Sequence, residues 1–164
     1  MAKEIERKFL VLDTHWREFA SAGATFQQAY IASMDDRSVR VRVIEGQKAL
    51  LTIKIGRNAL AREEFEYEIP LADACDMIKQ AIGIVIEKTR YKVVHHGFTW
   101  EIDVYDGIYR GLTVAEVEMK HEADNPTLPD WLGPEVTGDH RYSNQSLATE
   151  DLREEIGYGI SHPA

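Results

Sequence analysis

The sequence predicts an α+β protein built on an eight-stranded antiparallel β-barrel that closes around a charged lumen. Three observations predict this fold class. Eight segments alternate along the chain with a period of two, which is typical of strands. Turn signals such as Asp106-Gly107 separate several of these segments, and short turns suit antiparallel neighbours. In seven of the segments, one of the two alternating faces is charged, with two or more charged residues in six of them and Thr52 with Lys54 in the other.

The composition fits a single domain and excludes several classes of protein. The chain has 164 residues, of which 44% are hydrophobic, so intrinsic disorder is excluded. A formal net charge of −9 argues against a protein that coats nucleic acid, although a local basic pocket could hold a small anion. Cys75 is the only cysteine, so neither an internal disulfide nor a cysteine zinc cluster can form. We expect one domain at residues 1–150, with residues 151–164 as its C-terminal helical tail.

The location follows from the absence of targeting signals in the sequence. No apolar run approaches the roughly 18 residues that span a bilayer, and no secretory signal is evident. We therefore expect a cytoplasmic protein with no membrane or nucleic-acid partner.

The strands follow in chain order from the alternation. They are expected at residues 3–11, 27–33, 38–45, 49–56, 62–69, 84–94, 98–105 and 112–120. Turn signals between them include Asp35-Asp36, Glu45-Gly46 and His96-Gly97, which favour hairpin connections.

Helical signals are fewer than strand signals. Asp13 and Thr14 are placed to cap a first short helix. Residues 71–82 carry apolar side chains at helical spacing, and Gly83 follows as a stop. A third helix is expected near residues 145–156, after a stretch interrupted by three prolines.

The charged faces of the strands are the most informative feature of the sequence. Residues at i and i+2 of a strand share a face, so each charge pair lies on one side. The plain interpretation is a set of half-exposed strands with polar faces in water. A solvent face usually mixes in uncharged residues, however, whereas these faces hold eight acids and seven bases in near balance. They are Glu4, Glu6, Glu64, Glu66, Glu101, Asp103, Glu116 and Glu118, and Lys8, Arg40, Arg42, Lys54, Arg62, Lys88 and Arg90.

The near balance of acidic and basic residues on these faces, in a chain of net charge −9, suggests that the charged faces of the strands point toward one another. Eight strands can close a barrel whose lumen holds a small ligand. The apolar faces would then point outward and be covered by helices. Enclosed charges are costly unless they are paired, hydrated or neutralised. A wet tunnel that holds a polyanion with a hard divalent cation, Mg²⁺ or Mn²⁺, meets that requirement.

The motifs also occur in the order found in a known family. They are Glu4-Ile5-Glu6-Arg7-Lys8, Arg40-Val41-Arg42, Thr52-Ile53-Lys54, Arg62-Glu63-Glu64-Phe65-Glu66, Glu87-Lys88-Thr89-Arg90-Tyr91, Glu101-Ile102-Asp103, Glu116-Val117-Glu118 and Arg141-Tyr142-Ser143-Asn144. Over roughly residues 2–150 the chain resembles the CYTH superfamily, the triphosphate tunnel metalloenzymes. Within that family it looks most like the short bacterial inorganic triphosphatases.

The resemblance implies a role for each charged position. Lys8, Arg40, Arg42, Lys54, Arg62, Lys88 and Arg90 would bind the triphosphate, and Glu4, Glu6, Asp103, Glu116 and Glu118 would hold the metal. Lys8, Lys88 and Glu4 would be catalytic, with Glu64, Glu66, Glu101 and Tyr30 in support. For Arg62, Glu64 and Glu66, a structural role and a direct catalytic role both remain open.

The resemblance further implies a divalent-metal-dependent triphosphatase that uses Mg²⁺ or Mn²⁺. The expected reaction is hydrolysis of inorganic tripolyphosphate to pyrophosphate and phosphate. The alternatives are a class IV-type adenylate cyclase, a thiamine or nucleoside triphosphatase, and a non-catalytic polyphosphate-binding module. The expected partner is a small triphosphate-bearing substrate, and the protein is expected to be a monomer or homodimer.

Overall fold

The computed structural model describes residues 3–57 and 61–156, and within them eight strands form one sheet. The strands are β1 (Lys3–Leu10), β2 (Ala24–Met34), β3 (Arg37–Ile44), β4 (Lys48–Ile55), β5 (Ala61–Ile69), β6 (Ile82–His95), β7 (Phe98–Tyr105) and β8 (Thr113–Glu118). No helix of the described part is long and apolar enough to cross a membrane.

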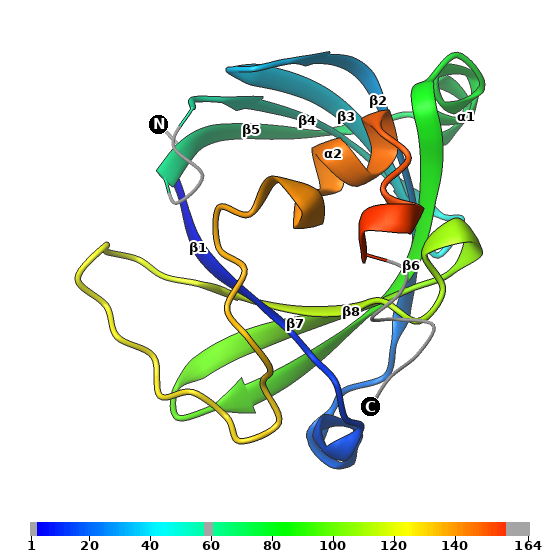
Figure 1. The fold of residues 1–164 in the computed structure, drawn as a ribbon. Helices are drawn as coiled ribbons and strands as arrows, with labels where there is room; N and C mark the ends of the chain where they lie inside the picture. The colour runs from blue at the N-terminus through cyan, green and yellow to red at the C-terminus, as the bar shows by residue number, and fades with distance from the viewer. Residues whose placement is uncertain (1–2, 58–60, 157–164) are drawn as a thin grey trace.

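The sheet closes into a barrel with the order β1-β5-β4-β3-β2-β6-β7-β8, and every neighbouring pair is antiparallel (Figure 1). The predicted eight-stranded antiparallel barrel is therefore confirmed. The seam between β1 and β5 is short, because β1 pairs with β5 only at Lys3 to Ile5. Farther along, residues 133–136 bond to the edge of β1 that faces away from β8, through Leu10 and Lys8.

The helix α1 (Leu71–Lys79) lies in the stretch where the sequence predicted a helix, and it covers the outside of β2, β3 and β4. Its Ala74 is fully buried against Val41 and Val43, the outward-facing side chains of β3. The helix is shorter than the predicted 71–82, because Ile82 already begins β6.

The opposite outer face is covered mostly by irregular chain rather than by helices. The first predicted helix is a five-residue 3-10 turn, η1 (His15–Phe19), and Thr14 makes no side-chain capping bond to it. Trp16 of this turn and Trp131 of the proline-containing stretch pack in one cluster with the buried Trp100 of β7. The rings of Trp100 and Trp131 are in edge-to-face contact, with centroids 6.1 Å apart, so this stretch packs against the outside of the barrel.

The C-terminal helix differs from the expectation of helices outside the barrel. After the 3-10 turn η3 (His140–Tyr142), the helix α2 (Asn144–Thr149) lies within the ring of strands (Figure 1). Residues 153–156 are helical as well. Leu147, Leu152 and Ile156 are buried in one cluster with side chains of the barrel lumen, namely Tyr30, Ile86, Tyr105 and Val114.

This packing has a simple physical cause. The lumen faces of the strands are charged along one half and apolar along the other, as Lys8 and Leu10 of β1 illustrate. Apolar surface inside a wet tunnel is unfavourable unless it is covered, and α2 with the following turn covers it. The predicted boundary at residue 150 stays a prediction, although Leu152 and Ile156 belong to the core of the barrel.

Candidate active site

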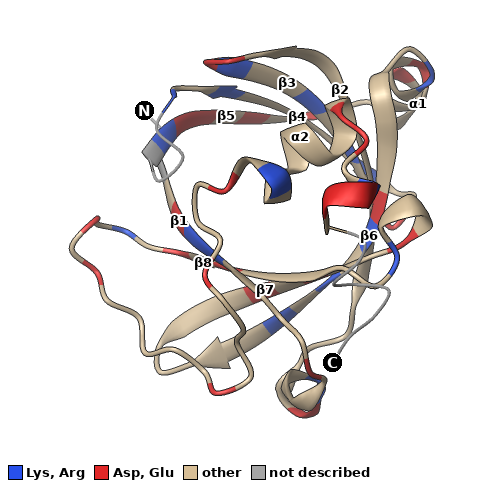
Figure 2. Cartoon of the chain, in the orientation of Figure 1, with Lys and Arg blue, Asp and Glu red and all other residues tan. Residues whose placement is uncertain are grey.

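One cavity of about 220 Å³ occupies the charged half of the lumen. It is lined by Glu6, Lys8, Tyr30, Ser38, Arg40, Arg42, Lys54, Arg62, Glu64, Glu66, Arg90, Glu101, Glu116, Glu118, Ser143, Asn144 and Gln145. Basic and acidic positions occur on strands around the ring (Figure 2). The predicted convergence of the charged strand faces is thus what the structure shows.

Among the predicted site residues whose side chains the structure describes, two do not line this cavity. Lys88 and Asp103 are 1% and 2% exposed and lie beneath its surface. Glu4 belongs to β1, where its backbone pairs with Arg62, but its side chain lies outside the described residues.

The register of the strands sets which charges meet. Arg40 of β3 lies opposite Thr52 of β4, and Thr52 lies opposite Glu66 of β5. The Thr52 hydroxyl donates to Glu66 Oε2 at 3.0 Å and accepts from Arg40 Nη2 at 3.3 Å. Arg40 Nη2 is 3.9 Å from the same carboxylate oxygen, so Glu66 and Thr52 together orient this guanidinium.

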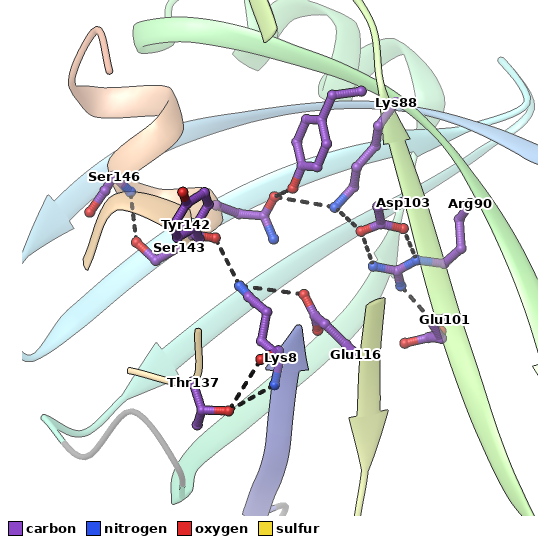
Figure 3. A network of polar contacts seen from close by, with 12 residues as sticks. Lys8, Lys88, Arg90, Glu101, Asp103, Glu116, Thr137, Tyr142, Ser143 and Ser146 are labelled. Carbon is purple, nitrogen blue, oxygen red and sulfur yellow. Dashed lines mark hydrogen bonds and ion pairs between the residues drawn. The ribbon is translucent and has the colours of Figure 1, made fainter. Parts of the chain in front are cut away.

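Lys88, Arg90 and Asp103 form a buried network between β6 and β7 (Figure 3). Asp103 Oδ2 accepts from Lys88 Nζ at 2.6 Å and from Arg90 Nη2 at 2.9 Å, and its Oδ1 accepts from Arg90 Nε at 2.7 Å. Arg90 also reaches Glu101 Oε2 at 3.2 Å. Both oxygens of Asp103, a residue expected among the metal ligands, are therefore engaged with cations of the protein.

Burial and charge act in opposite directions on this network. Burial lowers the pKa of Lys88 to about 7, assisted by Arg90 and Arg42, although Asp103 partly opposes the shift. Burial would raise the pKa of Asp103, but Lys88 and Arg90 outweigh it and hold that pKa far below its ordinary range. Lys88 is thus a lysine whose protonation can change near neutral pH.

Lys8 stands in a different environment, at the edge of the C-terminal segment (Figure 3). Its Nζ donates to the Tyr142 carbonyl at 3.0 Å and lies 3.5 Å from Glu116 Oε1. Burial would lower the pKa of Lys8, but Glu116, Glu6 and Asp103 outweigh it and raise that pKa. Lys8 is therefore charged at neutral pH.

Arg42 is held by two residues to which the sequence assigned no role. Its Nε donates to Gln28 Oε1 at 2.8 Å, and its guanidinium lies 4.6 Å from the centre of the Phe26 ring. The Arg90 guanidinium lies 4.9 Å from the centre of that same ring. Burial, together with Arg40 and Arg90, lowers the pKa of Arg42 to about 9, which still leaves it charged at neutral pH.

The acidic side of the cavity offers the oxygen ligands that Mg²⁺ and Mn²⁺ prefer. Glu6 of β1 lies directly opposite Glu118 of β8, and Lys8 lies opposite Glu116. No three carboxylates or imidazoles gather into a metal-binding group among the described residues. The donor set fits a hard cation held by one or two protein carboxylates and completed by oxygens of a bound anion.

The C-terminal segment contributes cavity residues that carried no predicted role. Ser143, Asn144 and Gln145 line the cavity, and Ser38 of β3 does so as well. Ser143 also caps α2, since its Oγ accepts from Ser146 N at 3.1 Å. A serine before a short helical segment indicates such a cap, but it does not indicate that the helix enters a barrel.

The fold and the cavity define a class of protein, a closed barrel whose lumen gathers cationic and carboxylate side chains around one cavity. The chain belongs to the CYTH domain family, whose model matches residues 2–153. An inorganic triphosphatase from Acetivibrio thermocellus is 44% identical over 148 residues, which cover 90% of this chain and 94% of that protein.

Two further comparisons agree with that assignment. An inorganic triphosphatase from Nitrosomonas europaea is 34% identical over 149 residues, covering 88% of this chain and 96% of that protein. A crystal structure described as an inorganic triphosphatase superposes with a TM-score of 0.62 at 31% identity, covering 92% of this chain and 97% of that one.

Proposed function

We propose that this protein is a divalent-metal-dependent triphosphatase that hydrolyses inorganic tripolyphosphate to pyrophosphate and phosphate. The observation that carries the proposal is the cationic wall of the enclosed cavity, made by Lys8, Arg40, Arg42, Lys54 and Arg90. Arg40 Nε is buried there without a hydrogen-bond partner among the described residues, so this guanidinium has a donor that the described protein groups do not use. The relatives named as inorganic triphosphatases support the same substrate.

The cationic side chains bind and orient the substrate. Arginines suit bidentate contact with phosphate oxygens, and lysines supply compact charges. Phosphoryl transfer needs mainly positioning and charge neutralisation. A water oxygen bonds to the terminal phosphorus, the P–O bond to the bridging oxygen breaks, and pyrophosphate leaves with the bonding electrons. Lys8 stays charged at neutral pH, so it can stabilise the negative charge that develops.

The carboxylates divide into two groups in this proposal. Glu6 and Glu118 would hold the metal, with Glu4 and Glu116 beside them, whereas Glu64 and Glu66 orient cations. Asp103 would position Lys88 and Arg90 instead of binding metal, because those side chains already fill its oxygens. A bound Mg²⁺ or Mn²⁺ would neutralise phosphate charge and acidify a coordinated water.

The test is product formation from three substrates with Mg²⁺ or Mn²⁺. We expect orthophosphate from tripolyphosphate at a higher kcat/KM than from ATP or thiamine triphosphate. Cyclic AMP with pyrophosphate would instead establish a cyclase, and tight binding without turnover would establish a binding module.

A matched pair of variants on one strand locates the reaction. Arg42→Ala removes a cavity cation, and we expect it to lose most of kcat/KM. Arg37→Ala removes an exposed cation of the same strand that pairs with Asp36 at 3.1 Å, and we expect unchanged kinetics. Equal kinetics in both variants would place the reaction outside this cavity.

A further inference from the structure

Asn144 connects a buried lysine to the surface of the cavity. Its Oδ1 is 3.2 Å from Lys88 Nζ and 2.6 Å from the Tyr105 hydroxyl. Asn144 lines the cavity, whereas Lys88 and Tyr105 do not. The asparagine therefore stands between the cavity and the buried pair of Lys88 and Asp103.

The contact with Lys88 assigns the orientation of the amide. An ammonium group only donates hydrogen bonds, so the Asn144 atom beside Lys88 Nζ is the acceptor Oδ1. The hydroxyl of Tyr105 donates to the same oxygen. With Oδ1 engaged by these two buried donors, the Nδ2 amide group is the side-chain donor that Asn144 retains for a ligand in the cavity that it lines.

Lys88 also changes the strength of this donor. A cation that donates to the oxygen of an amide polarises the group, which strengthens hydrogen bonds from its nitrogen. The second tie of Lys88, to Asp103 at 2.6 Å, fixes the ammonium in place. Lys88 can thus act on a ligand in the cavity without touching it.

We propose that Asn144 is a substrate-binding residue whose Nδ2 donates to an oxygen of the bound polyphosphate, and that Lys88 acts through this amide as a positioning residue. The proposal rests on the function proposed above. A neutral donor at this position complements the arginines, because it binds oxygen without adding repulsion between cations. The first residue of α2 then has a function beyond covering apolar surface.

Asn144→Asp separates this role from a purely structural one. The variant keeps an oxygen acceptor for Lys88 and Tyr105, so its melting temperature should not fall. It replaces the cavity-facing donor by an anion, and we expect KM for tripolyphosphate to rise about 10- to 100-fold, the range for losing a hydrogen bond to a charged group. The dissociation constant for tripolyphosphate without metal, measured by calorimetry, should rise equally.

The control is Ser143→Asp, which adds the same charge one residue earlier on the cavity wall. Aspartate caps helices as well as serine does, so α2 should remain formed. We expect a clearly smaller rise in KM than in Asn144→Asp. An equal rise in KM in Ser143→Asp would mean that any added negative charge on the cavity wall weakens binding, and it would overturn the proposal. An unchanged KM in Asn144→Asp would overturn it as well.

Lys88→Met tests the second half of the proposal. Removing the ammonium leaves the Asn144 amide in place but no longer polarised by a cation. We expect a higher KM in Lys88→Met, and a further rise in the double variant with Asn144→Asp that is smaller than the rise that Asn144→Asp causes alone. Full additivity would show that the two residues act independently. Failure of the wild-type protein to hydrolyse tripolyphosphate would count against the proposed function, whereas wild-type turnover with an unaffected Asn144→Asp counts against this inference alone.

Discussion

At the scale of single residues, four cations of this lumen lie within 4 Å of a carboxylate, namely Lys8, Arg40, Lys88 and Arg90. Lys88 differs from Lys8 in the direction of its pKa shift. Burial of Lys88 outweighs its contact with Asp103 and lowers its pKa to about 7, whereas the pKa of Lys8 is raised. Removing one partner from such a pair leaves an uncompensated buried charge, which is costly. The same imbalance makes Lys88 sensitive to any anion that enters the cavity.

The first prediction concerns proton uptake by Lys88. At pH 8.5 the side-chain amino group of Lys88 is mostly neutral, since this pH lies above its pKa of about 7. A bound polyphosphate favours the charged form and raises that pKa, so binding should take up protons from solution. Calorimetry of tripolyphosphate binding without metal, in buffers of different ionisation enthalpy, measures the uptake. Lys88→Met should lose most of it, and an unchanged uptake would assign the titration to another group.

The second prediction concerns Phe26, whose ring contacts the guanidinium groups of both Arg42 and Arg90. Each cation–π contact is worth about 0.5–2 kcal/mol, so the ring holds two like charges at fixed positions. Phe26→Leu should raise KM for tripolyphosphate roughly 3- to 30-fold with little change in kcat. Phe26→Tyr keeps an aromatic face and should restore most of the affinity. Equal KM values for the leucine and tyrosine variants would mean that the ring only fills space.

At the scale of elements, the position of α2 depends on a close approach to β6. Gly83 has φ of +68°, and a Cβ built there would lie 2.0 Å from the Ala148 carbonyl oxygen of α2. The sequence marked Gly83 only as a helix stop. Its absent side chain instead allows the helix to lie against the strand, which places Asn144 at the cavity.

The third prediction uses two glycines with similar backbone and different surroundings. Gly46 has φ of +64° with nothing within 4 Å of a built Cβ, so Gly46→Ala carries the conformational cost alone, about 1–2 kcal/mol. Gly83→Ala carries that cost and also displaces α2. We expect the melting temperature to fall clearly further in Gly83→Ala, and kcat/KM to fall only there. Similar melting temperatures for both variants would show that α2 can shift without cost.

The strand faces of the barrel could be predicted from the sequence, whereas the position of α2 could not. Charge pairs at i and i+2 predicted the strand faces and the lumen, because alternation is a local property of a strand. The apolar positions two residues from these pairs, such as Ile86 beside Lys88 and Val114 beside Glu116, indicate that part of the lumen is dry. They do not indicate which segment covers it, since that depends on packing between distant parts of the chain. The roles of Asn144, Gln28 and Phe26 were missed for this reason.

At the scale of the whole molecule, the barrel holds cations and carboxylates around one cavity, and we expect its stability to be coupled to what it binds. Like charges directly opposite each other across a strand pair are destabilising. Glu6 and Glu118 form such a pair on β1 and β8, and Arg40, Arg42 and Arg90 share the opposing region. A polyphosphate with its metal would relieve both repulsions together.

The last prediction is therefore a cooperative thermal shift. With one or two protein carboxylates available to a cation, Mg²⁺ or Mn²⁺ alone should raise the melting temperature only slightly. A non-hydrolysable tripolyphosphate analogue at about 100 times its dissociation constant should stabilise by about 2.7 kcal/mol, or about 5–10 °C for a chain of this size. The analogue with metal should exceed the sum of the two separate shifts. Glu118→Gln should keep the shift from the analogue, lose the extra shift from metal, and melt no lower than wild type without ligands. Glu122→Gln, an exposed position beyond β8, should behave as wild type. An undiminished metal contribution in Glu118→Gln would place the cation elsewhere in the lumen.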